Sequence, residues 1–219
     1  MVKVKTFFTN SFLSNCYVVF KECGSEIIVI DPTVSEALYS FLDALLPQKV
    51  ILLLTHEHFD HTTGVNEIKK RYNTELICIR QCADKIAQKR NNRPLSLMGM
   101  SHASDAKFPL YECFADKIFD GESSIDWLGD TVRIIPTPGH TSASCCILVA
   151  QYAFTGDSAL LGIPTITRFP TGNATQYASI TVPFLKSLDS DTIVMPGHGE
   201  SFTINKVKWT DNCFQMIDR

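Results

Sequence analysis

The sequence lacks an apolar run long enough to cross a membrane, and it has little excess charge of either sign. Its 219 residues carry 20 Lys and Arg against 23 Asp and Glu, which gives a formal net charge of −3 at pH 7. A membrane helix needs about 20 predominantly apolar residues, and nucleic-acid binding usually requires an excess of basic residues. We therefore expect neither a membrane nor a nucleic acid as a partner.

A secretion signal and a disulfide framework are also missing. Lys3 and Lys5 open the chain, but Thr, Asn and Ser interrupt the following apolar residues at 9–11 and 14–15. The eight cysteines include no Cys-x-x-Cys pair, which makes a cysteine zinc site or a redox pair unexpected. In a chain of this length we expect reduced, mostly buried thiols and a cytoplasmic location.

Apolar patterning predicts strands and helices that alternate loosely along a single domain, 1–219. Predicted helices cover 34–46, 64–72, 81–89 and 176–188. Predicted strands cover 2–8, 15–20, 27–30, 49–54, 75–79, 131–136, 145–150, 152–154 and 192–195. This mixture predicts an α+β fold of two mixed sheets packed together, with helices on the outer faces.

Metal-ligand side chains are concentrated directly after the predicted buried strand at 49–54. The pattern His-x-His-x-Asp-His is formed by His56, His58, Asp60 and His61. On a strand that leads into a turn, His56 and His58 point the same way because side chains alternate. Asp60 and His61, turned away by the loop, can serve a second ion nearby.

Three further ligand-type residues follow apolar strands at sharp glycine turns, and they are His140, Asp157 and His198. A glycine before each lets the backbone turn tightly and deliver the side chain at a strand end. Five of the six histidines thus fall at predicted strand ends, which indicates a metal site. The sixth, His102, is expected to be structural or to line a pocket.

These motifs resemble the metallo-β-lactamase superfamily, and most nearly its glyoxalase II (hydroxyacylglutathione hydrolase)-like, short single-domain branch. The resemblance runs from 15–17 through 196–199 and is closest at the ligand motifs. It implies an αββα sandwich with two metal ions at one edge.

The resemblance also implies an assignment of ligands. One ion is assigned to His56, His58 and His140, and the other to Asp60, His61 and His198, with Asp157 bridging them. Imidazole and carboxylate ligands suit two Zn²⁺ ions, and Fe or Mn²⁺ is compatible with the same donors. As ligands of the second ion, Asp60 and His61 are also the expected catalytic residues.

Two such ions lower the pKa of a shared water, which gives hydroxide at neutral pH. Hydroxide can attack an acyl carbonyl while a metal stabilises the oxyanion. A thiolate leaving group needs little protonation because the pKa of a thiol is about 8.5. We therefore expect a thioester hydrolase that acts on a small acyl-thiol, such as an acylglutathione-like compound.

Spacing narrows the activities known in this superfamily. Asp157 follows His140 by only 17 positions, which leaves no room for the inserted domain of the RNA-processing nucleases. True β-lactamases usually lack the bridging aspartate. Only 21 residues follow His198, so we expect the helical substrate domain of full-length glyoxalase II to be missing. An iron-dependent sulfur dioxygenase, a lactonase or phosphodiesterase, and a non-catalytic metal-binding module stay open as alternatives.

Substrate contacts are expected from the loops at 91–111 and 160–172. The second loop keeps the Phe-Pro-x-Gly turn of the glyoxalase II-like pattern but lacks the glycine and acidic residue around its arginine. Apolar side chains there would bury an acyl group, and Arg168 would pair with a substrate carboxylate or make a surface ion pair. The expected substrate-binding residues are Met98, Arg168 and Phe169. The expected partner is a small molecule, and a homodimer stays open.

Overall fold

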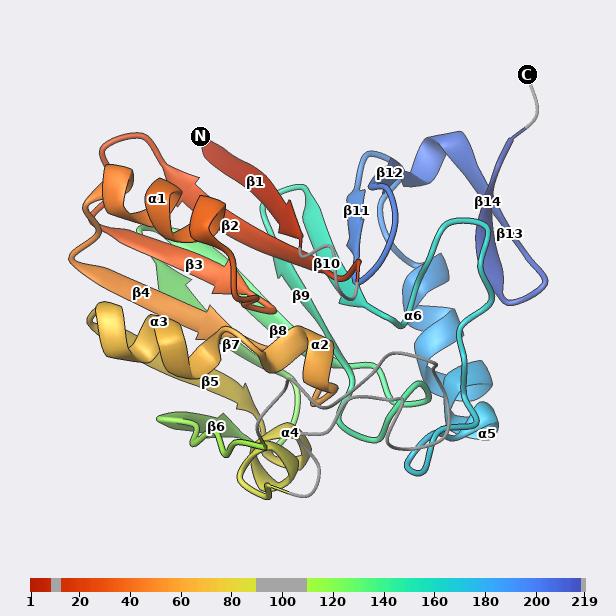
Figure 1. The fold of residues 1–219 in the computed structure, drawn as a ribbon. Coiled ribbons are helices and arrows are strands. Elements are labelled where there is room, and N and C mark those ends of the chain that lie inside the picture. Colours follow the sequence, from red (N-terminus) through yellow and green to blue (C-terminus); the bar gives the residue numbers. More distant parts are fainter. Residues whose placement is uncertain (9–12, 90–109, 218–219) are drawn as a thin grey trace. The chain divides into compact units, whose positions relative to one another are not determined.

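The computed structural model describes residues 1–8, 13–89 and 110–217, and Met98 and His102 lie outside them (Figure 1). Two compact units, Met1–Phe119 and Asp120–Arg219, divide the chain. Each unit contains a six-stranded sheet with both parallel and antiparallel neighbours. The predicted α+β class with two mixed sheets is therefore confirmed.

The sheet of unit 1 has the strand order β1-β2-β3-β4-β5-β6. Its strands are β1 (Val2–Phe8), β2 (Asn15–Lys21), β3 (Glu26–Ile30), β4 (Lys49–Leu53), β5 (Thr74–Ile79) and β6 (Lys117–Phe119). The first three strands are antiparallel neighbours, whereas β3 through β6 run parallel. The carboxyl ends of β3 and β4 therefore lie next to each other, which places Asp31 beside Thr55.

The central strands of this sheet are buried on both faces, as their nearly continuous apolar sequences predict. Every residue from Ile27 to Ile30 and from Val50 to Leu53 is buried. Helices α1 (Glu36–Leu45) and α3 (Val65–Arg71) lie along this sheet (Figure 1). The first begins two residues later than predicted because the Ser35 hydroxyl accepts a hydrogen bond from the Leu38 amide and caps it.

Two short helices of unit 1 flank the histidine motif. Helix α2 (Phe59–Thr62) starts within the motif, and α4 (Arg80–Ile86) follows β5 directly. The turn between α2 and α3 depends on Gly64, since a Cβ atom there would lie 2.6 Å from the carbonyl oxygen of Thr33. The Gly64 amide also donates to the Pro32 carbonyl at 2.8 Å, so the segment after Asp31 packs directly against this turn.

The sheet of unit 2 has the order β12-β11-β10-β9-β8-β7. Its strands are β7 (Ser123–Trp127), β8 (Asp130–Pro136), β9 (Cys145–Val149), β10 (Tyr152–Gly156), β11 (Ile193–Pro196) and β12 (Phe202–Thr203). Among these strands only β10 and β11 are parallel neighbours. The amide of Gly197 donates to the carbonyl of Gly156 at 2.8 Å, so the turns that follow these two strands are joined.

The helix predicted at 176–188 is broken into three pieces. They are α5 (Ala174–Gln176), a π-helical turn (Tyr177–Thr181) and α6 (Val182–Lys186). The start is earlier because the Asn173 side chain accepts from the Gln176 amide at 3.0 Å. Pro183 has no amide hydrogen to continue the α-helical ladder, and the wider π turn lies directly before it.

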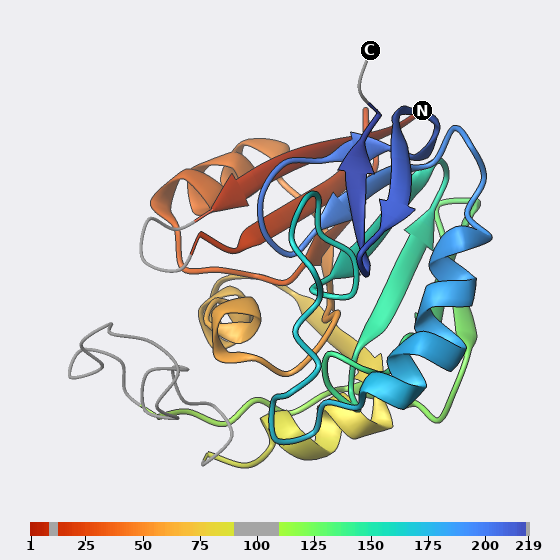
Figure 2. The same ribbon diagram turned by 90° about the vertical axis from the view of Figure 1, so that its right-hand side faces the viewer.

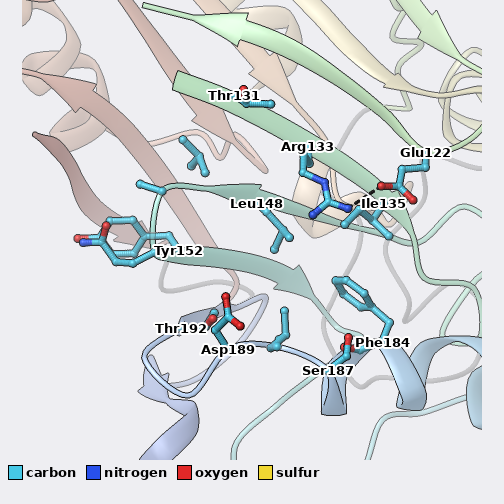
Figure 3. A pocket seen from close by; sticks show the side chains of 14 residues that line it. Glu122, Thr131, Arg133, Ile135, Leu148, Tyr152, Phe184, Ser187, Asp189 and Thr192 are labelled. Carbon is cyan, nitrogen blue, oxygen red and sulfur yellow. Dashed lines mark hydrogen bonds and ion pairs between the residues drawn. The ribbon is translucent and has the colours of Figure 1, made fainter. Parts of the chain in front are cut away.

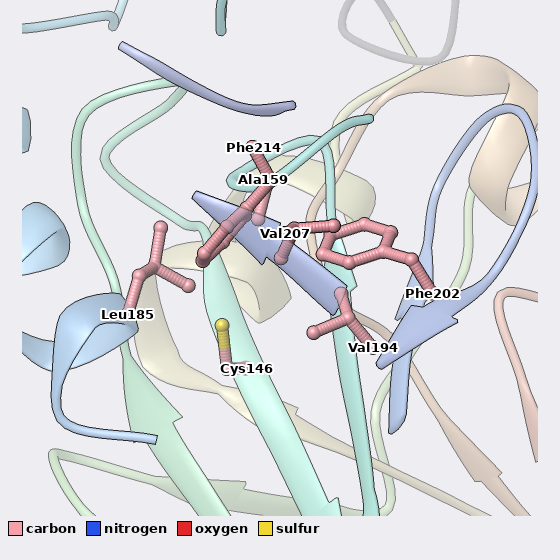
Figure 4. Packing of buried hydrophobic residues seen from close by; sticks show 7 residues of the cluster. All are labelled: Cys146, Ala159, Leu185, Val194, Phe202, Val207 and Phe214. Carbon is pink, nitrogen blue, oxygen red and sulfur yellow. The ribbon is translucent and has the colours of Figure 1, made fainter. Parts of the chain in front are cut away.

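A C-terminal hairpin that the apolar pattern did not predict completes unit 2 (Figure 2). It consists of β13 (Val207–Thr210) and β14 (Cys213–Met216). The two turn residues Asp211 and Asn212 have positive φ angles of 50° and 60°, which match the turn that hairpins favour. Val207 and Phe214 pack into a buried cluster with five other residues: Cys146, Ala159, Leu185, Val194 and Phe202 (Figure 4).

The hairpin also holds the start of the loop after β10. Leu161 forms a parallel bridge with Phe214, and the Gly162 amide donates to the Phe214 carbonyl at 2.6 Å. The loop that carries Arg168 and Phe169 therefore begins at a fixed point of unit 2.

All eight cysteines are free thiols, and seven are buried whereas Cys23 is exposed. Burial raises the pKa of the Cys16 and Cys146 thiols to about 12, because the thiolate loses its hydration there. The predicted burial of most thiols is confirmed. No helix within the described residues is long and apolar enough to cross a membrane.

Thiol reactivity tests this distribution. At pH 8 the native protein should show a single fast-reacting thiol with a disulfide reagent, because the reagent reaches only an exposed thiol. Cys23→Ser should abolish the fast phase, and denaturant should release the remaining seven thiols. A fast phase that persists in Cys23→Ser would contradict the burial of the others.

Candidate metal centre

The ligand-type side chains of unit 1 gather at the end of β4. The His56 ring lies 4.6 Å from the His58 ring and 4.2 Å from the His61 ring, measured between centroids. Nε2 of His61 is 3.4 Å from a carboxylate oxygen of Asp60. The rings of His56 and His61 are fully buried. All four side chains of the predicted motif are therefore brought together in one place.

A single helical turn produces this grouping. The sequence predicted a loop after His58, but α2 begins at Phe59, and the His61 amide donates to the His58 carbonyl at 3.0 Å. Alternation along the extended backbone places His56 and His58 on one side. The helical turn then rotates Asp60 and His61 back beside them.

The carboxylate of Asp31 orients two of these histidines. One oxygen accepts from the Thr55 amide at 2.7 Å, and the other accepts from the Thr55 hydroxyl at 2.6 Å and faces Nδ1 of His61 at 3.0 Å. Because the Thr55 hydroxyl donates to Asp31, its oxygen is left to accept from Nδ1 of His56 at 3.1 Å. Both imidazoles then carry their proton on Nδ1, which makes Nε2 the metal-binding atom.

Sequence reasoning did not assign a role to Asp31. Although Asp31, His56 and His61 lie close enough to share an ion, the Asp31 oxygens are already engaged with Thr55 and His61. Asp31 therefore supports the ligands rather than binding metal itself. The signal in the sequence was an aspartate at the end of an apolar strand, which becomes informative only once β3 and β4 are known to be parallel neighbours.

Unit 2 contains the other three predicted ligands around one carboxylate. One oxygen of Asp157 lies 3.5 Å from Nε2 of His140, and its other oxygen lies 3.6 Å from Nε2 of His198. These separations are too long for good hydrogen bonds. A carboxylate that faces a different imidazole with each oxygen is arranged as a bridging ligand would be.

Turn geometry and a backbone contact fix His140. Gly139 has a φ of +141°, and a Cβ atom there would lie 2.4 Å from Cβ of Tyr177, so only glycine fits. Nδ1 of His140 lies 2.8 Å from the Ile166 carbonyl, which keeps the proton on Nδ1 and directs Nε2 toward Asp157.

The donors of both units fit metal ions. Imidazole nitrogens and carboxylate oxygens suit Zn²⁺, Fe or Mn²⁺. Three imidazoles have Nδ1 directed at a protein oxygen, as is usual for histidines that bind a metal through Nε2. The His and Asp clusters are therefore consistent with a dinuclear metal site, and they leave the identity of the metal undefined.

The predicted substrate-binding residues are placed in part. The Phe169 ring lies edge-on to the His140 ring with centroids 5.2 Å apart. Arg168 is exposed and makes no ion pair with any other residue in the described ranges. Met98, the third predicted substrate-binding residue, lies outside the described part of the chain.

Unit 2 also contains a pocket of about 370 Å³ (Figure 3). Strands β8 to β10 and helix α6 contribute its lining, which includes none of the seven predicted ligands. Arg133 and Glu122 form an ion pair of 2.7 Å within it.

A family model for the metallo-beta-lactamase superfamily matches residues 10–198, a span that includes all seven predicted ligands. The chain belongs to the metallo-beta-lactamase superfamily. Among curated members, hydroxyacylglutathione hydrolase GloC of Haemophilus influenzae is 27% identical over 201 residues, which cover 90% of this chain and 91% of that protein.

Solved structures of the superfamily share the fold. BLEG-1 B3 metallo-beta-lactamase matches with a TM-score of 0.78 at 24% identity, over 93% of this chain and 95% of that one. A di-iron-bound form of TTHA1623 matches with a TM-score of 0.69 at 20% identity, over 92% and 95% of the two chains. The metallo-β-lactamase fold predicted from the motifs is confirmed, and the chain is a metal-dependent superfamily member with a histidine-rich site.

The support from Asp31 can be tested by substitution. Asp31→Asn keeps the size of the side chain but removes the charge and one acceptor oxygen shared by Thr55 and His61. We expect Zn²⁺ affinity to fall by about 10- to 100-fold, as for other residues that orient metal ligands. Competition with a coloured chelator measures it. Asp126→Asn, at an exposed position of β7, is the control, and equal affinities in the two variants would contradict the role of Asp31.

Proposed function

We propose that this protein is a dinuclear metal-dependent hydrolase that cleaves small acyl-thiols, with a hydroxyacylglutathione-like thioester as the substrate class. The observation that carries the dinuclear centre is the Asp157 carboxylate, which faces His140 with one oxygen and His198 with the other. Such a carboxylate suits two ions, because its two oxygens face histidines that are assigned to different ions.

The proposed ligands are assigned to the two ions in the way that the superfamily pattern implies. His56, His58 and His140 would hold one ion, Asp60, His61 and His198 the other, and Asp157 both. When bound, two such ions supply hydroxide at neutral pH and polarise the acyl carbonyl. The protein would fix the imidazoles through Asp31, Thr55 and the Ile166 carbonyl, so that little rearrangement is needed during the reaction.

A thioester suits this site because five of the six histidines are proposed ligands, which leaves few groups to act as a general acid. A thiolate departs without protonation at neutral pH, whereas an amine or alkoxide does not. The likeness to hydroxyacylglutathione hydrolase GloC over nine-tenths of both chains supports the same substrate class.

The loop after β10 is proposed to bind the substrate. Ile163 and Ile166 are 53% and 41% exposed, although isoleucine is usually buried. The Ile166 carbonyl contacts His140, and the Phe169 ring packs against the same imidazole. Apolar side chains here would cover the acyl group, and the exposed guanidinium of Arg168 would bind a substrate carboxylate.

Metal content tests the dinuclear centre. Protein purified without added metal should contain about two ions per chain, and His198→Ala should lower that number toward one, because His198 would serve only the second ion. Elemental analysis of both proteins gives the answer. Two zinc equivalents support hydrolysis, whereas one iron in both proteins favours the sulfur dioxygenase and would overturn the dinuclear proposal. A third outcome is two iron ions per chain, as in the di-iron-bound form of TTHA1623. That result would support the dinuclear centre.

Substrate selection tests the role of Arg168. Arg168→Ala should reduce kcat/KM for a carboxylate-bearing acyl-thiol by about 10- to 100-fold, the value of a charged hydrogen bond, and spare a neutral thioester. Arg133→Ala, at an exposed arginine of the other pocket, should leave both rates unchanged. Asp60→Asn should be inactive on both substrates. Equal losses on the two substrates would exclude Arg168 from recognition, and full activity in Asp60→Asn would overturn the hydrolase itself.

A further inference from the structure

A largely buried ion pair joins the histidine motif to helix α4. Glu57 stands between His56 and His58, and its carboxylate accepts from the Lys85 ammonium at 2.6 Å. The side chains of Glu57 and Lys85 are only 8% and 18% exposed. The Lys49–Glu75, Lys69–Asp116 and Lys70–Glu67 pairs are all more exposed on both sides.

Stability alone does not account for this pair. Removing two charges from water costs free energy that their attraction often fails to recover, and apolar residues of similar size are frequently as stable. The Lys49–Glu75 pair of the same unit avoids most of that cost, since both side chains remain about one-third exposed. The burial of Glu57 and Lys85 indicates a positional role.

The pair connects the motif to a rigid support. Lys85 belongs to α4, where Cys82 and Ile86 are fully buried and the Ile86 carbonyl accepts from the Cys113 amide at 2.9 Å. The ammonium therefore projects from a helix that is itself fixed in the core of unit 1. The hydrogen bond from the Lys85 ammonium therefore holds the Glu57 carboxylate against a fixed helix.

Anchors and proposed ligands alternate along the backbone. Thr55 is held by Asp31, and Glu57 is held by Lys85, while His56 lies between them. His56 and His58 therefore each follow directly after a residue whose side chain is held by another part of unit 1. The peptide that precedes His58 is therefore fixed by Glu57, just as the peptide that precedes His56 is fixed by Thr55.

We propose that Lys85, acting through Glu57, is a positioning residue that sets the spacing of His56 and His58 for metal binding. This inference rests on the proposed metal site. The sequence pattern contains no sign of it, because metal ligation by the two histidines makes no demand on the residue between them. Only the packing of α4 against the motif makes Glu57 informative.

Zinc affinity, measured by chelator competition on metal-stripped protein, tests the proposal. Glu57→Gln and Lys85→Met should each weaken Zn²⁺ binding by about 10- to 100-fold, as expected when a supporting contact of the ligands is lost. The double variant should be no weaker than the weaker single variant, because both changes break one contact. Lys85→Arg retains the charge and should stay close to the parent protein.

The direction of the Lys85→Met effect separates positioning from charge. If Glu57 attracted the cation merely by its charge, removing the Lys85 ammonium would strengthen Zn²⁺ binding while Glu57→Gln weakened it. Positioning predicts that both variants bind more weakly. Lys49→Met, which breaks the Lys49–Glu75 pair, is the matched control and should leave the affinity unchanged.

Several results would overturn the proposal: unchanged affinity in Lys85→Met or Glu57→Gln, tighter binding in Lys85→Met, or additive losses in the double variant. Circular dichroism checks that each variant is folded. If Lys85→Met does not fold, Glu57→Gln and Lys85→Arg are compared instead. Weak Zn²⁺ binding by Glu57→Gln together with parent-like binding by Lys85→Arg supports the proposal. A parent protein that binds no zinc, iron or manganese would instead refute the proposed metal site.

Discussion

The contacts of one buried carboxylate, Asp31, determine much of unit 1. Asp31 directly follows β3 and has a φ of +51°. It binds Thr55, the residue that precedes the histidine motif after the parallel strand β4. A left-handed conformation costs a non-glycine residue roughly 1–2 kcal/mol, and the hydrogen bonds to Thr55 and His61 offset that cost. Removing the carboxylate would leave both partners unsatisfied in the core, so strand order, backbone strain and imidazole orientation depend on the same two oxygens.

Unit 2 also places ligand-type side chains at the ends of parallel strands, but different groups hold its histidine. Its parallel neighbours β10 and β11 end at Gly156 and Pro196, and the turns beyond them deliver Asp157 and His198. Here a backbone carbonyl, that of Ile166, fixes the imidazole of His140, where unit 1 uses a carboxylate and a hydroxyl. In both units, parallel strand ends place polar side chains at the same edge, while the contacts to Nδ1 set the tautomer.

Sequence reasoning found what is local and missed what depends on pairing distant segments. The motif from His56 to His61 and the glycine turns are short-range patterns, and the apolar strands β3 and β4 are evident from their composition. The role of Asp31 depends on strand order, which brings it to Thr55, 24 positions away. The role of Lys85 depends on helix packing, which brings it to Glu57, 28 positions away. The hairpin β13–β14 was missed because each of its strands is only four residues long, too short for a clear alternating pattern.

The loop after β10 is held at both ends by backbone hydrogen bonds, so changes in its exposed side chains are separate from changes at the metal ligands. The C-terminal hairpin holds the loop at Gly162, and the Asn173 amide bonds the Gly139 carbonyl at 2.9 Å at its other end. Within the loop, His140 depends on the backbone carbonyl of Ile166 and not on its side chain. The exposed side chains of Ile163 and Ile166 can therefore be replaced without disturbing the histidine. New substrate preferences can then arise on a scaffold whose metal chemistry stays intact.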